Sequence, residues 1–469
     1  MNHNYLKTAN LFVSLFFVSY GTKAQVVLNN GLSRFKIIRY EENYDHLKGT
    51  DSTKFIEKIK HVQIGKTDTY VSFGGEVRLD YERTHDPVFG LIKGNDNSGQ
   101  FRTYLHADNH IGKKFRVFAQ LASGIKKWGL NAPLPLEEDK LFVHQAFAEY
   151  DFSNNPNKRV ILRIGRQELQ VGSGRILSTR IGPNIRQSFD VGRMVFMGFS
   201  KWNFNAFYGR PVYNQLGVFD NKILDRRSPE FWNIATTRSY KNFNTDIYYF
   251  GYHKQRAVFN RGVGDEMRHS IGGRIYARKT FDFDIEALYQ FGKFSDADIN
   301  AYTASANIGY SFKSTLFKPR FGLKVDYISG DKNSNSKSFQ TFNAMFPDGG
   351  YFGGVRALGP SNLFDIHPSV DFQFAENFKL STASILVWRA RLADGLYNPG
   401  GIVIVKEPGT NRERYVGWQL SQSARWEINR YFSVIGIYAH FFAGDYLNQS
   451  ANTTRTSTDF FSILTTFQF

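Results

Sequence analysis

The chain has 469 residues, a formal charge of +17 and no cysteine, which excludes disulfides and thiolate metal sites. Aromatic residues make up 16% of the sequence, yet the mean hydropathy is only −0.39, and this combination argues against a bundle of membrane-spanning helices. The basic balance suggests anionic partners.

The N-terminus has the pattern of a secretory signal peptide. Lys7 is the one charge ahead of an apolar run over residues 9–20, and small residues follow up to Ala24. We therefore expect residues 1–24 to be cleaved from an exported protein, which makes nucleic acid an unexpected partner. Residues 25–69 precede the first predicted strand and are expected to form a periplasmic N-terminal extension.

From residue 70 onward, apolar and polar side chains alternate in segments of about ten residues. This alternation predicts strands with one apolar and one polar face. About eighteen such segments run along the chain, and we predict an all-β fold, a single antiparallel transmembrane β-barrel over residues 70–469. The segments begin near residues 70, 100, 114, 142, 158, 191, 202, 231, 243, 268, 281, 298, 318, 361, 378, 415, 431 and 457.

The connections between these segments alternate between short and long. A bacterial outer-membrane barrel shows this asymmetry, with short periplasmic turns and long extracellular loops. A soluble β-sandwich, the alternative, has no reason to keep that rhythm. We expect long loops at residues 83–98, 124–141, 167–190, 211–230, 254–267, 329–360, 390–414 and 443–457.

The last segment, residues 459–469, supports the outer-membrane prediction. Phe461, Ile463 and Phe467 share one face of this strand, and the chain ends on Phe469. Many bacterial outer-membrane barrels close with an amphipathic strand of this kind.

Charged residues of the predicted strands share the face opposite the apolar one. A charge facing lipid costs a few kcal/mol at mid-membrane, so we expect this face to line the lumen. Two functions remain open for these residues, since they can guide an anionic solute or pair with one another and stiffen the wall. The cations are Arg78, Arg102, Arg116, Arg163, Arg274, Arg320, Lys324, Arg389 and Arg425. The acids are Glu76, Asp80, Asp108, Asp326, Asp365, Asp371 and Glu427.

Four arginines occupy the irregular stretch GRQELQVGSGRILSTRIGPNIRQSFD at residues 165–190: Arg166, Arg175, Arg180 and Arg186. A long loop of a large barrel can fold into the lumen and narrow it. Arginine offers a planar fork that matches a carboxylate, so the stretch predicts an electrostatic filter for anions. The alternative is an exposed basic loop that faces the phosphates of lipopolysaccharide.

Several motifs resemble those of the bacterial alginate export family of outer-membrane barrels. The resemblance implies an eighteen-stranded barrel with an arginine-lined lumen through which an anionic polyuronate leaves the cell. It implies pore roles for Arg78 and Arg102, and motif roles for Arg166, Arg175 and Arg186. The motifs are RYEENY (39–44), KHVQIG (60–65), SFGGEVRLDYE (72–82), GRQEL (165–169), GSGR (172–175), GPNIRQSFD (182–190) and AHFFAGDYL (439–447).

The chain also departs from that family at particular residues. Glu168 stands where the alginate exporter has a basic residue, and no Arg or Lys lies between Phe432 and Phe441. Gln419 and Ser421 stand where the family often has acids.

We therefore predict an outer-membrane channel for an anionic polysaccharide such as alginate. Lipopolysaccharide and a periplasmic export scaffold are further expected partners. The main alternative is an anion-selective diffusion porin for small acids or oligosaccharides, and a structural or adhesive barrel is another. No enzyme is expected, because the chain has no Gly-x-Ser-x-Gly and its 11 histidines are scattered. No metal or cofactor is expected either.

Overall fold

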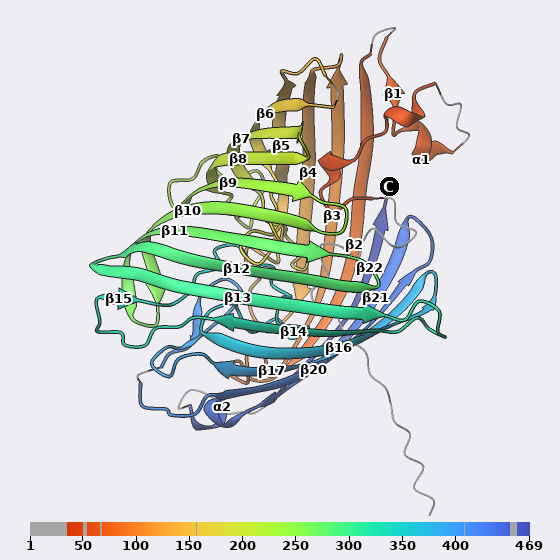
Figure 1. Cartoon of the computed structure of the whole chain (residues 1–469). Helices are drawn as coiled ribbons and strands as arrows, with labels where there is room; N and C mark the ends of the chain where they lie inside the picture. The colour runs from red at the N-terminus through yellow and green to blue at the C-terminus, as the bar shows by residue number, and fades with distance from the viewer. Residues whose placement is uncertain (1–34, 50–53, 66–67, 156, 408, 451–456) are drawn as a thin grey trace, which may run out of the picture.

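The computed structural model describes residues 35–49, 54–65, 68–155, 157–407, 409–450 and 457–469, so the predicted signal peptide lies outside the described residues. Figure 1 shows one sheet that curls round on itself. Eighteen strands form its wall: β2 (Tyr70–His85), β3 (Asn95–Ile111), β4 (Phe115–Trp128), β5 (Asp139–Asp151), β6 (Arg159–Gln167), β7 (Phe189–Phe199), β8 (Trp202–Pro211), β9 (Glu230–Ser239), β10 (Asn244–Phe259), β11 (Gly262–Ala277), β12 (Phe281–Phe294), β13 (Ala297–Ser311), β14 (Arg320–Ile328), β16 (Leu363–Ala375), β17 (Phe378–Arg389), β20 (Tyr415–Glu427), β21 (Phe432–Ala443) and β22 (Ser457–Gln468).

The remaining elements are short. Within the described residues, no helix is long and apolar enough to cross a membrane. These minor elements are η2 (Arg39–Glu41), η3 (Asp45–Leu47), α1 (Phe55–Lys58), β1 (Val62–Gln63), β15 (Ser338–Phe339), β18 (Leu396–Tyr397), β19 (Val403–Val405) and α2 (Asp445–Gln449).

The wall closes on itself. Each wall strand pairs antiparallel with the next wall strand along the chain, and β22 pairs with β2, for example through Val77 and Phe467. Closure leaves no free strand edge in lipid, where an unpaired backbone group is costly. The prediction of a single antiparallel barrel of about 18 strands is confirmed.

Alternation places apolar side chains on the outer surface of the barrel. Leu79 is 55% exposed and Ile164 is 58% exposed, while their neighbours Arg78 and Arg163 are buried on the inner side. Because successive side chains of a strand point to opposite faces, this single pattern produces a lipid-facing exterior and a charged interior.

One predicted loop is wrong. Residues 254–267 are mostly strand, since β10 and β11 continue through them and meet at a turn of Asn260 and Arg261. A register shift between Lys254 and Ala257 interrupts the pairing without ending it. These strands have 16 residues each, more than the roughly ten needed to cross a bilayer. Their ends can therefore carry polar residues that resemble a loop in sequence.

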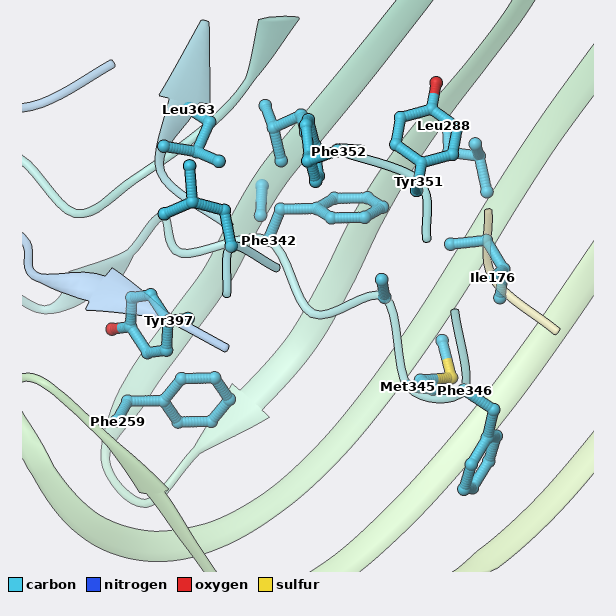
Figure 2. Packing of buried hydrophobic residues seen from close by; sticks show 14 of the residues in the cluster. Ile176, Phe259, Leu288, Phe342, Met345, Phe346, Tyr351, Phe352, Leu363 and Tyr397 are labelled. Atoms are coloured by element: carbon cyan, nitrogen blue, oxygen red, sulfur yellow. The ribbon is translucent and has the colours of Figure 1, made fainter. Parts of the chain in front are cut away.

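The barrel interior contains an apolar core. Figure 2 shows Phe342, Met345 and Phe346 of the connection between β14 and β16 among buried wall residues such as Leu288. On β10 the buried face carries Tyr248, Phe250 and Tyr252. The inner surface is therefore not polar throughout, because part of it serves as packing surface for a loop.

Candidate functional site

The connection between β6 and β7, residues 168–188, runs through the interior of the barrel. Leu177 and Ile185 in this loop are fully buried. Arg78 of β2 donates a hydrogen bond to the backbone of this loop. Arg175 of the loop donates to Thr303 of β13 at 2.7 Å. Strands far apart around the barrel therefore hold the loop. The alternative of an exposed basic loop does not hold.

Two wall arginines anchor the backbone of this loop. Arg78 donates to the carbonyl oxygens of Ile181 and Pro183, both at 3.0 Å. Arg102 donates to the Pro183 carbonyl at 3.0 Å and also binds Glu76 at 2.9 Å. Buried carbonyl groups need donors, and these guanidinium groups supply them where the loop has no regular secondary structure.

The arginines of the loop make buried contacts of their own. Arg175 lies 3.3 Å from the carboxylate of Asp326 and 3.8 Å from that of Glu286. Arg186 pairs with Glu168 at 2.7 Å. Charges removed from water need such partners.

Arg180 differs from the other loop arginines in its partners. It donates to the carbonyl oxygens of Pro347 and Met345 at 3.1 and 3.5 Å. Burial lowers its pKa to about 10, although Asp348 opposes the shift. The guanidinium stays charged at neutral pH, and its described hydrogen bonds go to backbone rather than to a carboxylate.

Glu168 is an organising residue that sequence reasoning noted only as a departure from the family. Its carboxylate lies 2.9 Å from His144 Nε2 and 2.7 Å from Arg186 Nε. Its carbonyl oxygen accepts a hydrogen bond from the Tyr40 hydroxyl at 2.7 Å. No local pattern links these residues, since Tyr40 precedes Glu168 by 128 positions.

The other predicted wall cations each have a carboxylate partner. The ion pairs are Arg116–Asp108 at 2.7 Å, Arg163–Glu149 at 2.5 Å, Arg274–Asp284 at 2.6 Å, Arg320–Asp282 at 2.5 Å, Lys324–Asp326 at 3.6 Å, Arg389–Glu407 at 3.2 Å and Arg425–Glu427 at 3.0 Å. Pairing therefore cancels much of the local excess of positive charge. Arg389 also lies at the end of β17 and donates to the Asn411 and Glu413 carbonyls of the following loop.

Arg166 is not a lumen residue, and its expected place there is wrong. It lies on β6 with the same parity as exposed Ile164, two positions away. It pairs with Asp190 of β7 at 2.8 Å and donates to the carbonyl oxygens of Val143 and Lys222. Sequence reasoning placed Arg166 in an irregular segment, where strand parity could not be used. The strand in fact continues to Gln167.

Part of the predicted N-terminal extension packs against the inner wall. The Tyr40 ring lies against Phe118 and Phe147, with ring centroids 6.1 and 5.2 Å apart. The guanidinium of Arg163 lies 4.2 Å from the centre of the same ring. Arg39 donates to the carbonyl oxygens of Gly75 and Phe469. These contacts were not visible in the sequence.

The described residues hold no group of three or more His, Cys, Asp or Glu side chains that could bind a metal ion. The interior presents guanidinium groups bound to carbonyl and carboxylate oxygens, and a solute carboxylate is an acceptor of the same kind.

Comparison with known proteins gives one family and a consistent fold. A family described as alginate export matches residues 69–461. No curated protein matches the sequence.

Several solved structures of Pseudomonas aeruginosa proteins have a similar fold. OpdO superposes with a TM-score of 0.56 at 11% identity, over 85% of this chain and 97% of that one. OccK2 (OpdF) in complex with glucuronate gives 0.57 at 11% identity, over 85% and 98%. OpdK with vanillate gives 0.59 at 10% identity, over 86% and 98%. At these identities the likeness concerns the fold.

Proposed function

The chain belongs to the alginate export family of outer-membrane barrels, and from that premise we propose that it is a channel for an anionic carbohydrate, with a polyuronate as first candidate. Membership of this family and the eighteen-stranded outer-membrane barrel favour a channel over an enzyme. The finer proposal concerns what passes through it.

The observation that carries the proposal is the set of arginines where the β6–β7 loop meets the wall. Arg78 and Arg180 bind carbonyl oxygens, and no described carboxylate makes an ion pair with either. Among the described residues, neither guanidinium has a carboxylate within ion-pair distance, so both contribute positive charge to the electrostatic field that a passing carboxylate meets. A pore conducts when such sites attract the solute and none holds it too tightly.

Single-channel recording in a planar bilayer tests the proposal. Anion selectivity in a salt gradient, together with blocks by polymannuronate that lengthen with chain length, is the expected result. Arg78→Gln and Arg180→Gln should shorten these blocks, whereas Lys293→Gln, whose side chain is 61% exposed, serves as the matched loss of one charge elsewhere. Equal block times in all three variants would reject the arginine contact.

A second candidate is a diffusion channel for small organic acids. The packed interior favours it, since the loops at 168–188 and 329–362 both contribute buried apolar residues inside the barrel. Under this proposal glucuronate monomer alters the current and polymannuronate does not. A barrel that carries no current would reject both candidates and favour an adhesive role for the loops.

A further inference from the structure

An apolar pocket of about 720 Å³ opens near the long-loop end of the wall. It lies where β6 ends early, so that β5 pairs with β6 only from Ala146 onward. The segment between β8 and β9 reaches the start of β5 on the side where β6 is absent, and there Phe219 N donates to Leu141 O at 2.8 Å. The lining includes Ile164, Gly192, Tyr208, Phe219, Ile223 and Leu224.

The pocket faces outward, away from the lumen. Ile164, Gly192 and Tyr208 are register partners on three successive strands. Ile164 and Tyr208 are each 58% exposed, and a methyl group on Gly192 would meet no atom within 4 Å. Gly192 therefore forms the floor of a groove between two larger apolar side chains.

Two ion pairs border the end of the pocket that lies nearest the long loops. Arg166 binds Asp190 at 2.8 Å, and Arg210 binds Glu230 at 2.5 Å, all on the outward parity of β6 to β9. Asp190 also accepts a hydrogen bond from Leu224 N at 3.0 Å. This hydrogen bond holds the loop against the wall. Because the charged groups pair with one another, the accessible surface of the pocket is mainly apolar.

The loop over the pocket combines apolar and basic side chains. Ile223 is 77% exposed and Leu224 is 52% exposed. Lys222 and Arg226, both exposed, flank this pair in the sequence. Apolar and cationic residues together at a bilayer surface attract lipids with anionic headgroups.

We propose that this pocket binds one acyl chain of a phosphorylated glycolipid of the outer leaflet, with the lipid phosphate at Lys222 and Arg226. The long-loop end of an outer-membrane barrel lies at the outer leaflet, which provides the occupant. The inference depends on the membrane location of the barrel and not on the solute that it transports.

Native mass spectrometry tests the site with purified barrel and a diphosphorylated, multiply acylated lipid A. In the wild type, one lipid A molecule per barrel should remain bound after detergent exchange. In Gly192→Leu, which fills the groove, the fraction of barrels that retain lipid should fall at least tenfold. Gly436→Leu is the matched control, because Gly436 lies on the outer face of β21 with equally open space. Equal retention in both variants would overturn the proposal, and so would equal loss.

A second pair of variants tests the headgroup contact. The double change Lys222→Gln and Arg226→Gln should reduce lipid A retention several-fold, while Lys201→Gln on a short turn should not. An effect of the same size on a neutral diacylglycerol would overturn the phosphate assignment. Heat-dependent electrophoretic migration shows whether each variant has folded. If Gly192→Leu does not fold, Ile223→Gln on the exposed loop replaces it, and loss of bound lipid is again expected.

Discussion

Two segments occupy the barrel interior from opposite ends, and different residues hold them. The β6–β7 loop is held by the wall, through arginines such as Arg78 and Arg102 that donate to its carbonyl groups. The N-terminal residues 35–44 are held largely by their own side chains, Arg39 and Tyr40.

Two hydrogen bonds join the two segments, and we call this pair of contacts the junction. Tyr40 donates to Glu168 O at 2.7 Å, and Arg186 donates to Ile37 O at 2.8 Å. A change at this junction should therefore destabilise both segments. A change at a contact that holds only one segment should loosen that segment alone.

The largest effect is expected from Glu168→Ala at the junction. It leaves the buried Arg186 and His144 without their carboxylate, and removing one partner of a buried ion pair costs roughly 3–5 kcal/mol. Denaturant unfolding followed by tryptophan fluorescence should show a loss of this size, and channel noise should increase. A loss below about 1 kcal/mol would mean that other contacts fix the loop.

Tyr40→Ala should have the next largest effect, because it removes a buried ring together with one hydrogen bond of the junction. It removes the ring from Phe118, Phe147 and Arg163, a loss of roughly 3–5 kcal/mol in the local stability of the N-terminal segment, as for a buried aromatic. Limited proteolysis should cut the N-terminal segment faster and residues 168–188 to a smaller extent, with little change in global unfolding. Cleavage confined to the N-terminal segment would mean that the junction does not couple the two segments.

The wall could be predicted from sequence, because lipid outside and polar or packed groups inside impose a two-residue period on every strand. Leu79 beside Arg78 shows this logic at work. The two-residue period did not predict the position of Arg166, because the last residues of β6 run into a glycine-rich stretch without a clear alternation.

The interior contacts could not be predicted in the same way. The Tyr40–Glu168 hydrogen bond and the carbonyl partners of Arg78 depend on how an irregular loop is folded. An irregular segment has no repeat that fixes which side chains face each other. Charge alone indicated that the arginines would need partners, but not that backbone carbonyls would be among them.

A pH effect is expected in the N-terminal segment. Burial and the nearby charge of Arg39 lower the pKa of Lys60 to about 7, and its Nζ lies 4.9 Å from the centre of the Tyr44 ring. Between this value and the ordinary lysine pKa of about 10.4, the unfolded segment binds more protons than the folded one. Stability therefore rises with pH across that window, and the cost of burying the charged amine is fully present below it.

Protease protection of residues 35–65 should accordingly increase from pH 6 to pH 9. Lys60→Met should give high protection at both values, since it keeps the packing and removes the charge. A wild-type segment with equal protection at both pH values would show that the amine is not titrating there.

The smallest effect is expected from Tyr40→Phe, which keeps the ring and removes one of the two hydrogen bonds of the junction. The change deprives Glu168 O of a donor and Arg193 Nη1 of an acceptor 3.0 Å away, a loss of about 1 kcal/mol. If the junction couples the segments, this variant and Arg186→Gln will not be additive in a double-mutant cycle scored by proteolysis at both ends. Additive effects would mean that the loop and the N-terminal segment share a boundary but open independently, and that each end of the lumen is controlled by its own anchors.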